Sequence, residues 1–312
     1  MNLNTSRWKD RKDDINLEQQ CNILLDIQKK SFEKDSNKRP FYSNVKVDKS
    51  FDKPAEFNIN EDIITYNIFS FSFDKTVKNT NTILPDEDNI SNVSGIIIIY
   101  EKNGDINYII DKFSGSQTIL RGLLNYSGKE EILANNVSVD SDFIIWLIQK
   151  VYNNNNTFEF EDKFINEDSI TIESVMGFKG NSQDKVNKLT ADGNTVMNLI
   201  SSLTFLLESD SMEFIKMKIS TDNHRSIVFK LNTNGSVNIV IDDYRGQYKK
   251  NDVERDSLIS KVTLLVYLEI IPALNKWYSE DKENKVWNKE KYNKFLDELT
   301  TDIKGKIDNL KS

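Results

Sequence analysis

The strongest local constraint on this fold is a β-hairpin near residue 103. Residues 95–101 read as a buried strand with four consecutive isoleucines, and residues 106–111 read as the returning strand. Asn103-Gly104 separates them, and this dipeptide favours a type I′ turn because both residues tolerate positive φ. The sequence therefore predicts an antiparallel sheet in this part of the chain.

Further helices and strands flank the hairpin without a regular strand–helix alternation. An apolar stripe predicts a helix over 16–30, and Asp140 is placed to cap a helix over 141–152. A three-stranded antiparallel meander is predicted over 212–241, with Asn234-Gly235 as its second turn. Segregated helices and strands favour the α+β class. The remaining predicted elements are strands at 63–73 and 169–176 and helices at 118–125, 182–189 and 194–207.

Polar segments suggest where domains begin and end. Residues 34–53 are polar and contain Pro40, so we interpret them as a loop or linker. Four consecutive asparagines at 153–156 indicate a surface loop. We expect an N-terminal arm, helix and linker over 1–56, a first α+β domain with the hairpin over 57–139, and a second α+β domain over 140–312.

Two long C-terminal helices are predicted, over 253–278 and 286–310. The first is apolar over more than one face, which indicates burial between layers or at a subunit contact. Its most apolar stretch contains Lys261, Glu269 and Pro272, so we expect no membrane insertion there, and we expect the proline to kink the helix. Besides core packing, the two helices are candidates for self-association as a homodimer or for binding a protein partner.

A shortage of histidine and cysteine removes most well-marked enzyme classes. The chain has one His and one Cys, whereas a zinc site needs three or four such ligands. His224 is expected to be an exposed turn histidine, with a lone acid/base role as the alternative. The sequence predicts no catalytic residue, no metal and no cofactor. A lone Cys21 and a polar N-terminus without an apolar leader favour the cytoplasm.

Two weaker sequence patterns still allow a catalytic site or an anion-binding site. Glu161 and Lys163, with Asp140 or Asp142 upstream, supply the carboxylates and lysine of a Mg²⁺-dependent nuclease. Residues 177–182 form a glycine-containing segment before a predicted helix, which could offer backbone amides to an anion. Both patterns are short, and such matches arise often by chance in a chain that is 29% charged. We therefore favour a purely structural role for each segment.

Aromatic and cationic residues alternate in one loop after the meander, and a second basic cluster lies at the N-terminus. Cations neutralise phosphates and tyrosines stack on bases, so both segments are candidates for binding DNA despite the net charge of −8. The N-terminal segment is interpreted as a mobile basic arm, with a frayed terminus as the favoured alternative. The candidate nucleic-acid-binding residues are Tyr244, Arg245, Tyr248, Lys249 and Lys250 in the loop, and Arg7, Lys9 and Arg11 in the arm.

The middle of the chain resembles one known family. Asp142-Phe143-Ile144 opens a helix, Ile172-Glu173-Ser174-Val175-Met176 follows, and Gln183-Asp184-Lys185-Val186 comes next. This order is similar to the central region of RexA-type phage-exclusion (abortive infection) proteins and covers about a third of the chain. The resemblance implies a cytoplasmic, dimeric, prophage-encoded protein that senses phage or DNA and acts through another component. It supplies no catalytic residue.

Three functions follow as hypotheses. The first is a non-enzymatic DNA-binding or sensing component of a bacterial or prophage anti-phage defence system, acting with a partner effector. The second is a Mg²⁺-dependent nuclease of the carboxylate–lysine type that uses Glu161 and Lys163. The third is a protein-interaction scaffold built on the C-terminal helices. The chain has only one His and one Cys, the residue types that most often catalyse reactions, and this favours the first hypothesis.

Overall fold

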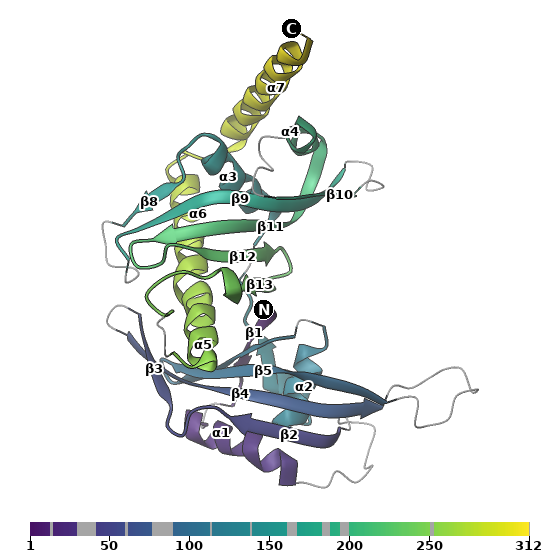
Figure 1. Cartoon of the computed structure of the whole chain (residues 1–312), viewed down its shortest axis with the longest axis vertical. Helices are drawn as coiled ribbons and strands as arrows, with labels where there is room; N and C mark the ends of the chain where they lie inside the picture. Colours follow the sequence, from purple (N-terminus) through teal and green to yellow (C-terminus); the bar gives the residue numbers. More distant parts are fainter. Residues whose placement is uncertain are drawn as a thin grey trace, which may run out of the picture. The chain divides into compact units, whose positions relative to one another are not determined.

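The computed structural model describes residues 1–12, 15–29, 42–59, 62–76, 90–112, 114–137, 139–160, 167–182, 188–193, 200–249 and 253–311. The chain divides into two compact units (Figure 1). We call Leu3–Asn136 with Glu254–Ser260 the hairpin unit, and Met1–Asn2, Val137–Val253 and Lys261–Ser312 the meander unit. Each contains helices and an antiparallel sheet, so the mixed α+β class is confirmed.

The predicted hairpin is present and centres the sheet of the hairpin unit. Strands β5 (Ile90–Lys102) and β6 (Asp105–Ile110) pair antiparallel, and Lys102 lies opposite Asp105 at the turn. Asn103 and Gly104 have φ values of 54° and 80°, as a type I′ turn requires. The local sequence thus determines this turn.

Strands from distant parts of the chain extend this sheet in the order β1-β6-β5-β4-β2. The predicted mobile arm is wrong, because residues 2–10 form strand β1 and Trp8 lies opposite Tyr108 of β6. The predicted loop over 34–53 is also wrong in part, because residues 43–49 pair with β4. The bounds are β1 Asn2–Asp10, β2 Ser43–Lys49, β3 Ala55–Ile59, β4 Asp62–Thr76 and β7 Ile132–Ala134; β3 pairs with β4 and β7 with β1.

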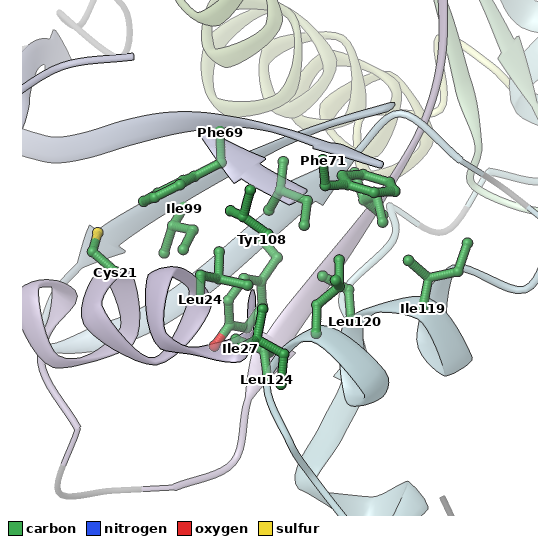
Figure 2. Close-up of a cluster of buried hydrophobic side chains, with 14 of the residues drawn as sticks. Cys21, Leu24, Ile27, Phe69, Phe71, Ile99, Tyr108, Ile119, Leu120 and Leu124 are labelled. Atoms are coloured by element: carbon green, nitrogen blue, oxygen red, sulfur yellow. The ribbon is translucent and has the colours of Figure 1, made fainter. Parts of the chain in front are cut away.

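Two helices supply the apolar core of the hairpin unit. Helix α1 (Leu17–Asp26) begins at a capping box, in which Asn16 Oδ1 accepts from Gln19 N at 2.9 Å and Gln19 Oε1 accepts from Asn16 N at 3.0 Å. Helix α2 (Ser116–Leu123) follows Gly115 at φ 73°. Figure 2 shows their side chains meeting those of the strands, among them Cys21, Leu24, Ile27, Phe69, Ile99, Tyr108 and Leu120.

The predicted meander is present in the meander unit. Its strands are β11 (Ser209–Thr221), β12 (Ile227–Asn232) and β13 (Val237–Val240), and Gly235 in the second turn has φ 80°. The sheet continues in the order β10-β9-β11-β12-β13, with β8 (Thr157–Glu159) on β9 (Ser169–Ser182). The predicted helix at 182–189 is wrong where the structure describes it, because β9 reaches Ser182 and β10 spans Lys188–Asp192.

Helix α3 (Ser141–Tyr152) lies against this sheet and against the C-terminal helices. Its predicted cap is present, since Asp140 Oδ1 accepts from Phe143 N at 2.7 Å. Phe143 contacts Tyr278 edge-on at 5.2 Å between ring centroids, and Lys150 Nζ lies 2.6 Å from Asp281. These contacts bury α3 between the sheet and α6 (Ile271–Glu283).

The C-terminal region is helical, as predicted, with an irregularity near the proline. Helix α5 (Arg255–Leu265) passes into a π-helical turn at Val266–Ile270 and then into α6, whose first turn contains Pro272. The π-helical turn ends at Ile270, two residues before Pro272, which has no backbone N–H to donate. Helix α7 (Lys289–Lys311) follows, and α4 (Ile200–Glu208) contacts it.

Among the described residues, one helical stretch has the length and apolar character of a membrane span. The most apolar 18-residue window within Arg255–Glu283 has a mean hydropathy of 1.7, and 78% of that window is buried inside the structure. Such burial is what a core helix shows, so this feature is weak evidence for a span.

Candidate functional site

Two loops that are far apart in sequence meet at one end of the meander. Residues 222–226 join β11 to β12, and residues 244–249 follow a 3₁₀ turn (Ile241–Asp243) after β13. Ser226 and Arg245 form an antiparallel bridge with N···O distances of 3.0 and 2.9 Å. Gln247 N also donates to Asn223 O at 3.0 Å. Backbone hydrogen bonds therefore fix one loop on the other.

A buried polar cluster lies between these loops. His224 is 0% exposed, so the expectation of an exposed turn histidine is wrong. Its Nδ1 lies 2.7 Å from the Tyr244 hydroxyl, which also accepts from Tyr248 N at 3.1 Å. Tyr244 is itself 0% exposed. The hydroxyl thus links both loops through side-chain and backbone contacts.

A buried carboxylate completes the cluster. Glu167 is 3% exposed and accepts from Asn223 N at 3.0 Å, and its Oε1 lies 3.5 Å from His224 Nε2. Burial lowers the pKa of His224 below its usual value, and the Glu167 charge opposes that shift. Burial also raises the pKa of Tyr244 to about 12. Both rings are therefore neutral near neutral pH.

Gly246 is required at its position by close packing. A Cβ there would lie 2.7 Å from the Tyr244 hydroxyl, 2.8 Å from His224 Nδ1 and 2.9 Å from the Asn223 carbonyl oxygen. Only a residue without a side chain lets the loop approach the cluster this closely.

The two loops enclose a polar hollow of 420 Å³ that three cationic side chains line. The cations are Arg225, Arg245 and Lys249, all exposed. Arg245 Nη1 donates to the carbonyls of Asp242 at 2.6 Å and Tyr244 at 2.7 Å, which orients the guanidinium. Within the described residues, none of the three pairs with a carboxylate. The hollow also contains one carboxylate, Asp222, whose Oδ2 accepts from Asp168 N at 3.2 Å.

The predicted residues of the 244–250 loop differ in their exposure to solvent. Arg245 and Lys249 line the hollow, whereas Tyr244 is buried and cannot stack on a base. Tyr248 is half-buried, and Lys250 lies outside the described residues. Sequence reasoning missed Arg225, because nothing in the sequence shows that residues twenty positions apart meet.

The predicted N-terminal cluster lies in the other unit. Arg7 Nε donates to Asn135 O at 2.5 Å, and Lys9 forms an ion pair with Asp105 at 2.7 Å. Arg11 is exposed just after β1. Two of these three side chains therefore have partners within their own unit.

The described residues contain no group of three or more His, Cys, Asp or Glu side chains placed to hold a metal ion. Glu161 and Lys163 of the nuclease pattern lie outside the described residues, as do residues 183–187. Asp142 accepts from Tyr278 at 2.5 Å and from Trp287 Nε1 at 3.1 Å. The predicted amide-presenting segment, 177–182, belongs to strand β9.

The chain matches no protein-family model and no curated protein sequence.

Proposed function

We propose that this protein is a non-enzymatic nucleic-acid-binding component that contacts the phosphates of DNA through Arg225, Arg245 and Lys249. The observation that carries this proposal is a hollow of 420 Å³ lined by three cations that pair with no carboxylate among the described residues. Guanidinium groups form two parallel hydrogen bonds to a phosphate, and lysine adds a point charge. The buried cluster beneath holds the loops in place before a ligand arrives.

The biological setting of this proposal comes from the resemblance to RexA-type proteins. Under it, the protein acts in the bacterial cytoplasm as a sensing component of prophage-encoded antiviral defence. A binding component without its own chemistry needs a partner effector or a second copy to produce a response. The C-terminal helices are our proposed contact for that partner.

DNA binding measured against salt concentration tests the proposal. We expect Arg225→Gln/Lys249→Gln to weaken binding and to reduce the slope of log affinity against log salt by about 2, because each phosphate contact contributes about 0.9. Among the residues that the structure describes, neither side chain holds the loops by a hydrogen bond, so this double variant should unfold at the same temperature as the wild type. Unchanged affinity and slope in a folded variant would refute the site.

A matched control has the same change in charge at a remote surface. Lys289→Gln/Lys291→Gln removes two exposed lysines of α7. This control should keep the wild-type affinity to within about twofold if local rather than total charge determines binding.

A further inference from the structure

The hollow between the two loops carries opposite charges that do not neutralise each other. Its cations are Arg225, Arg245 and Lys249, and its carboxylate is Asp222. Asp222 and Arg225 lie three positions apart in one loop, yet within the described residues Asp222 forms no ion pair with any of the three cations. Separated charges in one polar hollow complement a ligand that is anionic at one end and donates hydrogen bonds at another.

The Asp222 carboxylate is held by one of its two oxygens. Oδ2 accepts from Asp168 N at 3.2 Å, and within the described residues Oδ1 has no hydrogen-bond partner. Asp222 is exposed, so its carboxylate is open to a ligand. The Asp168 amide thus fixes the carboxylate and leaves one acceptor for a donor group that enters the hollow.

The amide side chains of the hollow bind the buried cluster instead. Asn223 Nδ2 donates to Glu167 at 3.2 Å, and Gln247 Nε2 lies 3.3 Å from His224 Nε2. Gln247 N also donates to Asn223 O at 3.0 Å. These two residues hold the loops together, so the charged side chains are the ones left to recognise a ligand.

The size of the hollow matches a nucleotide better than a phosphate group alone. At 420 Å³ the hollow falls within the range of about 300–1,000 Å³ that small-molecule sites occupy. One phosphate group fills only a small part of such a space. With the phosphate on the cations, the base is the part of a nucleotide that remains to contact Asp222.

We propose that the hollow binds one guanine nucleotide, with its phosphate on the three cations and its base on Asp222. The inference rests on the proposed function and names the base at the contact. Guanine carries two neighbouring donors, N1–H and the 2-amino group, and a carboxylate accepts from both. Adenine and cytosine place a ring acceptor beside their amino group, and thymine places a carbonyl on each side of its one donor, so a carboxylate is repelled by all three. This edge of guanine is reached in a free nucleotide or in an unpaired strand, because pairing covers it in a duplex.

Isothermal titration calorimetry of the full chain with guanosine and adenosine 5′-monophosphates tests this inference. We expect the wild type to bind guanosine monophosphate about 10–100-fold more tightly, which is the discrimination that a good pair of hydrogen bonds to a base provides. Asp243→Asn is the matched control, since it removes an exposed carboxylate of the adjacent 3₁₀ turn that does not line the hollow. This control should keep the wild-type preference.

Asp222→Asn should reverse the choice of base rather than merely weaken binding. The asparagine keeps an oxygen for the Asp168 amide, so its free position becomes a donor instead of an acceptor. The preference for guanosine over adenosine monophosphate should then fall to about 1. Xanthosine monophosphate, which has an oxygen in place of the 2-amino group, should bind this variant more tightly than guanosine monophosphate does. A collapsed loop would weaken all three nucleotides together, and that result would overturn the contact with Asp222.

Single-stranded thymine oligonucleotides with one central guanine or adenine, measured by fluorescence anisotropy, distinguish the source of the nucleotide. A guanine preference in the oligonucleotide identifies DNA as the source, whereas a preference in the mononucleotides alone supports the guanine site and refutes DNA as its ligand. Equal affinity for guanine and adenine, together with weaker binding by Arg225→Gln/Lys249→Gln, would overturn the guanine inference and leave the phosphate contacts standing. No binding of any nucleotide or oligonucleotide at low salt would refute both.

Discussion

Gly246→Ala is the sharpest test of how the candidate site is built. The added Cβ would lie within 3.0 Å of three atoms: the Tyr244 hydroxyl, His224 Nδ1 and the Asn223 carbonyl oxygen. The carbonyl belongs to the backbone, and the two side chains are buried, so none can swing into solvent. Overpacking of this kind costs about 1–3 kcal/mol, and we expect the upper half of that range.

Urea unfolding followed by tryptophan fluorescence measures this cost. Trp146, Trp277 and Trp287 belong to the meander unit, so the signal reports mainly on the unit that contains Gly246. Gly305→Ala is the matched control, since Gly305 lies inside α7 and no described atom beyond its chain neighbours and the nearby backbone of its own helix lies within 4 Å of the new methyl group. It should stabilise by about 0.5–1 kcal/mol because glycine is a poor helix former. Wild-type stability in Gly246→Ala would refute the close packing of loop on cluster.

Three further results are expected from the buried groups. Tyr244→Phe should lower the free energy of unfolding by about 1–3 kcal/mol, since it removes the hydroxyl that binds His224 Nδ1 and the Tyr248 amide; a loss below about 0.5 kcal/mol in urea unfolding would contradict the cluster. Because burial lowers the pKa of His224, its stabilising contribution is present above its ordinary pKa and is lost as pH falls through the lowered value. His224→Gln should flatten the dependence of unfolding on pH below about 6.5, and an unchanged profile would argue against the burial effect. Burial raises the pKa of the Cys21 thiol to about 11, so iodoacetamide should modify it near pH 8 only after unfolding, and rapid modification of the native protein would contradict its burial.

Local sequence determined the parts of the fold that depend on turn and cap chemistry. Asn103-Gly104, Asn234-Gly235 and Asp140 act over a few residues, and each predicted its element correctly. Strands β1 and β2 were missed because polar residues dominate them, and only pairing with β6 and β4 makes them strands. Strand preference of this kind comes from neighbours across the sheet rather than from the segment itself.

The candidate site was predictable only in part, for a similar reason. Arg245 and Lys249 were found because they lie beside tyrosines in one loop. Arg225 joins them only through the bridge between Ser226 and Arg245, which no sequence pattern shows. Tyr244 was expected to stack on bases because composition does not distinguish an exposed ring from one that binds a buried histidine.

The most direct test of the central claim is the salt dependence of DNA binding by Arg225→Gln/Lys249→Gln beside Lys289→Gln/Lys291→Gln. Both pairs change the net charge equally, and only the first changes the hollow. We predict weaker binding and a slope reduced by about 2 for the hollow variant alone. The same affinity and slope in both variants would contradict the assignment of the hollow as a phosphate-binding site.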